Sequence, residues 1–328
     1  MEKSSSRIIF FIASLFFLFL FLFVFVFKST AGTITISSAP TVSPTTVGAS
    51  ASYTVQFTPQ TAVSAGGNVQ VKFIFPQGVT FGLAGITRDS STSAQLLAIT
   101  NASQAQSSQT VIFSTSGLSA STEYTIKINE VINPGNPGMG IVAVATHDGT
   151  NYIDGNIQSD PPSTLSPSFQ IGTAAFKGKV TNPSSQPVAN AYVNIFPVVM
   201  GGPMPQGSST NYNGDYLIPT TNIANGASYK FEVFPPFEGG SNLISPTVDP
   251  KTYNGSPVTV DIQFQQATKT ITGTVKYSNN NAVVANATVN SFKMNGSGYA
   301  HNYQFVRSIY FDGWRRQLGR HASSAKRQ

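Results

Sequence analysis

Few side chains in this sequence are suited to chemistry, and their spacing matches no catalytic motif. Cysteine is absent, which removes thiol nucleophiles, thiolate metal sites and disulfides. The three histidines, His147, His301 and His321, have no His or Cys at metal-ligand spacing. Nucleophile-elbow, zinc-protease and phosphate-loop motifs are absent, and the scattered acidic residues form no glycosidase-type pair. We therefore predict no catalytic residue, no metal or cofactor site and no enzyme activity.

Asp148, Asp154 and Asn156 come nearest to a cation site, because carboxylate and amide oxygens are the ligands that calcium prefers. Their spacing fails the EF-hand pattern, since Thr150 and Tyr152 stand where Asp or Asn is needed. The two Asp-Gly pairs predict instead two turns around a short strand. A loose calcium site between modules is the alternative, and His147 is expected to be an exposed hairpin residue.

The formal charge of +6 comes from the two ends of the chain. Residues 33–306 carry ten Lys and Arg against eleven Asp and Glu, which is a net charge of −1. Nucleic-acid binding needs a basic face, so this near-neutral body excludes it. Only 10% of all residues are charged, and neutral polar residues take their place, as is typical of half-buried strands and turns.

The N-terminus carries an export signal. Lys3 and Arg7 precede a run of twenty apolar residues, 8–27, that only Ala13 and Ser14 interrupt. Small residues at Ser29 and Ala31 fit a signal-peptidase site after Ala31, which predicts a cleaved signal peptide over 1–31. The run is also long enough to span a bilayer, so an uncleaved N-terminal membrane anchor is the alternative. Either way, the rest of the chain is expected outside the cell or at its surface.

From residue 33 onward, apolar and polar residues alternate with period two, as in 53–57, 69–75 and 124–128. Alternation of this kind predicts strands with one buried face, and the turn residues between the runs predict β-sandwiches. Only 94–99 could also hold a short helical turn. The fold class is therefore all-β, with tandem sandwiches behind the N-terminal hydrophobic segment.

A shift in composition divides the exported chain. The Pro- and Ser-rich segment 161–173 is predicted to be a linker with extended, unpaired backbone. It separates a first module, 33–160, from a second, 174–266, and a shorter third segment follows over 269–304.

The second and third segments are copies of one repeat. Ala-Asn-Ala-x-Val-Asn-x-Phe occurs at 189–196 and again at 285–292, each time after a Gly-x-Val strand. Glycine inside a strand marks a bulge or the close approach of another backbone. The repeated or turn-forming residues are Gly178, Val180, Pro187, Val188, Ala191, Val193, Gly214, Tyr216, Gly273, Val275, Ala287 and Val289.

This pattern resembles the carboxypeptidase regulatory-like domain, a transthyretin-like β-sandwich. Gly178 to Val193, followed by Thr210-x-x-x-Gly214-x-Tyr216, carries the likeness over 174–266, and 269–304 carries it in part. Asn190 stands where the family often has Gly, and 199–207 is an insertion. The resemblance implies a non-catalytic domain. The first module is similar to Ig-like repeats of bacterial surface proteins, at 62–73, 75–78 and 132–134.

The tail, 305–328, differs from everything before it. Five of the seven arginines and the single Trp314 fall within it, and the strand alternation stops. The third segment is too short for a complete sandwich, which favours a frameshift or truncated reading frame. A basic tail that binds an anionic wall polymer or lipid is the alternative.

Together these patterns predict a non-catalytic, exported structural or adhesive surface protein. One alternative is a carbohydrate-binding accessory module, for which Tyr212, Tyr216, Phe234, Phe237 and Tyr253 are the candidate aromatic residues. Another is a fragment of a larger secreted enzyme. The expected partners are a cell-wall polymer or polysaccharide, and the membrane if the N-terminal segment is not cleaved.

Overall fold

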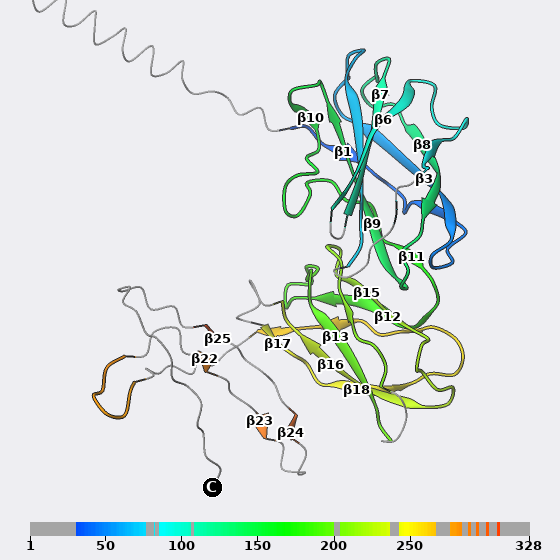
Figure 1. The fold of residues 1–328 in the computed structure, drawn as a ribbon. Coiled ribbons are helices and arrows are strands. Elements are labelled where there is room, and N and C mark those ends of the chain that lie inside the picture. The colour runs from blue at the N-terminus through cyan, green and yellow to red at the C-terminus, as the bar shows by residue number, and fades with distance from the viewer. Residues whose placement is uncertain are drawn as a thin grey trace, which may run out of the picture.

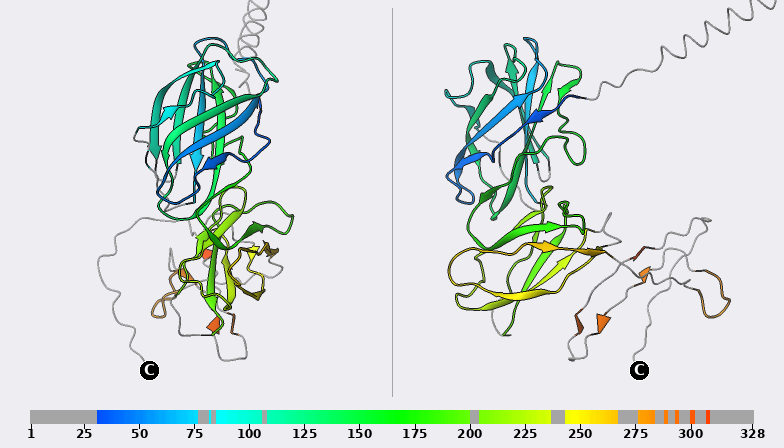
Figure 2. Two further views of the ribbon diagram at one scale, coloured as in Figure 1. Left: turned by 90° about the vertical axis from the view of Figure 1, so that its right-hand side faces the viewer. Right: turned by 180° about the vertical axis from the view of Figure 1, so that it is seen from behind.

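The computed structural model describes residues 31–76, 82, 85–105, 108–199, 204–236, 243–266 and 276–283, and four short strands between 288 and 308. Figures 1 and 2 show two β-sandwiches stacked end to end. No described residue lies in an α-helix, so the all-β prediction is confirmed. Within these ranges no helix could cross a membrane, and the predicted apolar run 8–27 lies outside them.

The first sandwich packs a five-stranded sheet against a six-stranded one. The first sheet has the order β1-β3-β8-β5, with β2 on the outer part of β3, and the second has the order β10-β9-β4-β7-β6, with β11 on β9. The strands are β1 (Ile34–Thr35), β2 (Thr41–Ser43), β3 (Ser50–Pro59), β4 (Asn68–Ile74), β5 (Thr87–Arg88), β6 (Leu96–Ala105), β7 (Ser108–Thr115), β8 (Tyr124–Ile132), β9 (Gly138–His147), β10 (Tyr152–Asp154) and β11 (Phe169–Ile171).

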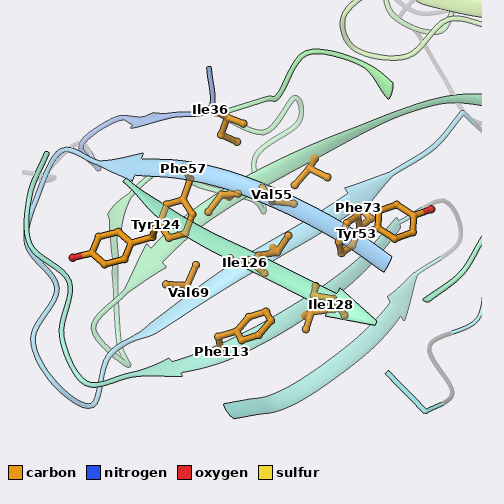
Figure 3. Close-up of a cluster of buried hydrophobic side chains, with 14 of the residues drawn as sticks. Ile36, Tyr53, Val55, Phe57, Val69, Phe73, Phe113, Tyr124, Ile126 and Ile128 are labelled. Atoms are coloured by element: carbon orange, nitrogen blue, oxygen red, sulfur yellow. The ribbon is translucent and has the colours of Figure 1, made fainter. Parts of the chain in front are cut away.

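The period-two pattern of the sequence places alternate side chains of β3, β4, β7 and β8 in one core (Figure 3). Tyr53 lies at one end of this core. The centroid of its ring is 5.1 Å from that of the Phe73 ring and 5.8 Å from that of the Phe169 ring. Its hydroxyl donates to Asn133 Oδ1 at 2.6 Å. Residues 96–105 form β6, so the alternative of a helical turn at 94–99 is wrong. Register shifts between Leu96 and Asn101 interrupt the alternation there.

Strand β9 differs from its neighbours because both of its faces are buried. Val142 and Val144 belong to the main core, whereas Ile141, Ala143 and Ala145 form a second cluster with Ile74 and Ile157. Leu165 and Tyr212 pack against this outer cluster. The first sandwich therefore has apolar surface on its outer side that only later segments of the chain cover.

The second sandwich has two four-stranded sheets. In the first of these sheets, β12 (Ala174–Thr181) pairs with β15 on one side and, in parallel, with β19 and β20 on the other. In the second, β13 and β16 are central and lie between β14 and β18. The remaining bounds are β13 (Tyr192–Pro197), β14 (Ser208–Ser209), β15 (Asp215–Pro219), β16 (Ser228–Phe234), β17 (Leu243–Ile244), β18 (Val248–Thr252), β19 (Val258–Thr259), β20 (Ile262–Gln263) and β21 (Gln265–Gln266). β17 pairs with β21, and Phe176 lies in the core against Tyr229 and Phe231.

The repeat residues of the second sandwich lie at its closest backbone approaches. A Cβ on Gly178 would be 2.1 Å from the carbonyl oxygen of Val260, and Gly214, with a φ of +76°, would place one 2.5 Å from that of Val180. Tyr216 is buried, and its hydroxyl donates to Val260 O at 2.7 Å. Val180, Val188, Ala191 and Val193 are also buried, whereas Pro187 is exposed.

The third segment is described only in pieces. Lys276 and Val283 bridge an exposed turn, β22 (Thr288–Val289) pairs with β25 (Arg307–Ser308), and β23 (Lys293–Met294) pairs with β24 (Ala300–His301). Val289 is thus in β22, and two residues of the basic tail pair with the repeat copy. Gly273, Val275 and Ala287 lie outside the described residues.

The contact at Gly178 gives a test of this packing. Gly178→Ala is expected to lower the free energy of unfolding by about 1–3 kcal/mol, because the new methyl group must displace the backbone at Val260. Urea unfolding, followed by the far-ultraviolet circular dichroism of the backbone, measures the loss of stability. Gly135→Ala is the control, since nothing lies within 4 Å of its Cβ position. Equal stability of the two variants would contradict the close approach.

Candidate functional site

The junction between the sandwiches is the most elaborate polar site in the described residues, and a single turn builds it. Asn211 Oδ1 accepts bonds from the backbone N–H groups of Asn213 and Asp215, each at 3.0 Å, and so closes the turn that enters β15. Its Nδ2 donates to the hydroxyl of Ser168 at 2.9 Å and to Met139 O, in β9, at 3.3 Å. One side chain, only 5% exposed, therefore shapes the turn and attaches it to the first sandwich.

Two further residues of the turn extend this attachment. Asn213 Nδ2 donates to Ser166 O at 2.8 Å, and the hydroxyl of Ser168 donates to Asp215 Oδ2 at 2.5 Å. Lys179 forms an ion pair with the other oxygen of Asp215, at 2.9 Å. Asp215 is thus held from both sides, by the segment between the sandwiches and by β12.

Tyr212 adds an apolar contact and a charge-assisted bond. Its ring packs against the outer cluster of β9, and its hydroxyl donates to Asp160 Oδ1 at 2.6 Å. Burial, followed by the hydrogen bond to Asp160 and the charge of that carboxylate, raises the pKa of Tyr212 to about 12. The side chain is therefore neutral, and a donor, at physiological pH.

The segment 161–173 is not the unpaired linker that its composition predicts. Leu165 bridges Ala143, Ser166 N donates to Val142 O at 2.8 Å, and β11 pairs with β9 from Phe169 to Ile171. Phe169 and Ile171 belong to the core of the first sandwich. Proline and serine fix local backbone preference, but the apolar residues between them dock this segment.

A groove of about 550 Å³ lies beside the junction, and Met139, β12 and the Asp215 end of β15 line it. Its charged side chains already have partners within the protein, and that of Lys177 is the amide oxygen of Gln170. Lys179 pairs with Asp215, and Asp261 Oδ1 accepts the backbone N–H of Lys179 at 2.8 Å. Within the described ranges no three His, Cys, Asp or Glu side chains are grouped as metal ligands would be. The arrangement is suited to holding backbone in place rather than to acid–base chemistry.

The residues considered for calcium have separate backbone partners, two of them in turns and one in a strand. Asp148 Oδ1 accepts the backbone N–H groups of Thr150 and Asn151, each at 2.7 Å, and these bonds lower the pKa of the carboxyl. Asn156 Oδ1 accepts from Gln158 N at 2.8 Å. Asp154 lies buried at the end of β10, with Oδ2 bonded to Thr61 N at 2.7 Å. The structure does not gather these three side chains around one point.

The aromatic residues considered for sugar stacking are engaged elsewhere. Tyr216 and Tyr253 are in the core of the second sandwich, and Tyr212 is in the junction. Phe234 is half-buried at the end of β16, and Phe237 lies outside the described residues. The sequence identified Tyr212 by type, but its role in joining the sandwiches depends on Asp160, which is distant along the chain.

No protein-family model and no curated protein matches the chain. The resemblance to the carboxypeptidase regulatory-like family therefore stays a prediction. Among solved structures, the T6 backbone pilin of Streptococcus pyogenes serotype M6 is 16% identical, with a TM-score of 0.24 over 68% of this chain and 52% of the pilin. The major pilin SpaA of Corynebacterium diphtheriae is 11% identical, with a TM-score of 0.27 over 72% and 69%. BcpA, the major pilin subunit of Bacillus cereus, is 11% identical, with a TM-score of 0.25 over 71% and 70%. The chain thus spans about half of the first of these proteins, and likeness at this level does not extend to function.

The Tyr212–Asp160 contact can be measured by a double-mutant cycle. Tyr212→Phe and Asp160→Ala are each expected to lower the free energy of unfolding, with a coupling of about 0.5–1.5 kcal/mol, because each removes the same hydrogen bond. Urea unfolding of the full chain is the measurement. Tyr192→Phe, which changes a more exposed hydroxyl of the second sandwich, is the control. Additive losses would show that the bond does not join the two sandwiches.

Proposed function

We propose that this chain is an exported, non-catalytic protein of the cell surface, in which the two sandwiches act as one stiff structural unit. The junction is the observation that carries this proposal. Asn211, Tyr212 and Asn213 all bond across it, and β11 continues the sheet of the first sandwich up to the start of β12. A flexible tether between binding modules needs none of these contacts.

The apolar N-terminal run supports the location that we propose for the unit, which is outside the membrane. An N-terminal run of twenty apolar residues directs the rest of the chain across a membrane, whether it is cleaved or kept as an anchor. The unit would hold an adhesive end away from the cell, with a wall polymer or polysaccharide as its partner. Sugar stacking by Tyr212, Tyr216 or Tyr253 is not favoured, because their rings already pack in the protein.

The stiffness of the unit is tested by NMR relaxation of the amide nitrogens in the full chain. The two sandwiches are expected to have the same rotational correlation time, because the junction fixes them together. In the double variant Tyr212→Ala/Asn213→Ala, which keeps Asn211 to close the turn, the two times are expected to separate. Tyr277→Ala/Asn279→Ala, in an exposed turn outside the junction, is the matched control. Independent tumbling of the unaltered sandwiches would overturn the proposal.

Location is tested by labelling intact cells with antibodies raised against the first sandwich. Labelling before lysis, lost after brief protease treatment of whole cells, is the expected result. Signal that appears only after lysis would contradict surface exposure.

A further inference from the structure

Gly32 is bonded into the first sandwich through both of its backbone groups. Its N–H donates to Ile153 O at 2.7 Å, and its carbonyl oxygen accepts from Gly155 N at 2.9 Å. These bonds place Gly32 beside Asp154 in a parallel bridge. The next residue, Thr33, exchanges further bonds with Gln60, so the chain is anchored from Gly32 onward.

Asp154 is fully buried at this point, and one of its carboxylate oxygens lacks a partner. Its backbone N–H donates to Thr146 Oγ1 at 3.0 Å, and Oδ2 accepts from Thr61 N at 2.7 Å. Oδ1 is buried and accepts no hydrogen bond from the described part of the chain. A buried carboxylate oxygen left in this way is costly, and such groups are ordinarily paired.

The unpartnered oxygen faces Gly32. A Cβ on Gly32 would lie 2.1 Å from Asp154 Oδ1, so a side chain at position 32 would displace the carboxylate. By standard bond geometry, the nitrogen of Gly32 is then within about 4.6 Å of this oxygen. In the continuous chain that nitrogen has one hydrogen, and its hydrogen bond is already accepted by Ile153 O.

We propose that the peptide bond between Ala31 and Gly32 is hydrolysed during export, and that the new α-ammonium group of Gly32 pairs with Asp154 Oδ1. A signal peptidase catalyses the reaction, and water is the second reactant. The C–N bond breaks, the oxygen of water becomes part of the Ala31 carboxylate, and the Gly32 nitrogen becomes an amine that takes up a proton. An α-amino group has an ordinary pKa of about 8, so it is charged at neutral pH. It offers two N–H donors more than the amide did.

Two independent observations meet at this bond. The small residues Ser29 and Ala31 mark it in the sequence as a cleavage site. The structure places an unpartnered buried carboxylate next to the residue that cleavage would expose. A metal ion is a poorer occupant, because no group of three His, Cys, Asp or Glu side chains surrounds Asp154 in the described ranges. The inference rests on the export that the proposed function includes.

The ion pair is tested on two chains that differ by one residue, 32–328 and 31–328, released from a fusion that leaves no added residue. Both carry an α-ammonium group, but only the first carries it on Gly32. Hydrogen exchange at the Thr61 amide, which donates to Asp154, is expected to be at least about tenfold slower in the chain that begins at Gly32. Its melting temperature is expected to be higher by roughly 3 °C or more.

Asp154→Asn is expected to abolish the difference between the two chains. Should that variant fail to fold, acetylation of the Gly32 amine keeps Asp154 and removes the charge, and is expected to speed exchange at Thr61 to the rate of the longer chain. Equal exchange in the two unmodified chains, or a difference that persists in Asp154→Asn or after acetylation, overturns the pairing.

N-terminal sequencing of the protein recovered from the surface of cells tests the cleavage itself. The expected reading is Gly32-Thr33-Ile34. A mature chain that begins at another residue, or that retains 8–27, overturns the inference even where antibody labelling places the protein at the surface. Failure of the inference is thereby separated from failure of the proposed function.

Discussion

The need to bury both faces of β9 governs the architecture of this protein. One face completes the core of the first sandwich, but the other presents Ile141, Ala143 and Ala145, which a single sandwich would leave in water. The chain covers this face with Ile157 and Leu165, which follow β10, and then with Tyr212 from the next sandwich. The outer face of β9 therefore determines the path of the segment between the sandwiches and the position of the second one.

The sequence predicts the strands better than it predicts their arrangement. Period-two alternation identifies β3, β4 and β8, because each has one buried face, and the turn at 210–214 is marked by Asn211 and Gly214. The continuous apolar run 141–145 in β9 is the signal that both faces are buried. The sequence does not predict the junction, because Asn211 and Asn213 are residue types expected in any turn. Their bonds to Ser166 and Ser168 are tertiary, and residue spacing does not encode them.

Most donors in the junction are neutral, although two of the acceptors are carboxylates. Asn211 and Asn213 donate to the hydroxyl of Ser168 and to Ser166 O, whereas Tyr212 and Ser168 donate to Asp160 and Asp215. Among the described residues there, Lys179 with Asp215 is the one ion pair. Salt screens attraction between exposed charges but leaves bonds between buried amides nearly unchanged. The bonds of Asn211 and Asn213 are therefore expected to keep their strength across wide changes in ionic strength, whereas the half-exposed pair of Lys179 and Asp215 is screened.

The parallel pairing of β12 with β19 and β20 has a mechanical consequence. The chain enters the second sandwich along β12 and returns along β19 and β20, with Phe176 opposite Val258 and Val180 opposite Ile262. Tension along the polypeptide pulls the start of β12 and the end of β20 in opposite directions, parallel to the strands. The hydrogen bonds between them are then loaded together in shear, not opened one after another as in a zipper. This sandwich is thus built to resist stretching at the edge where force enters and leaves it.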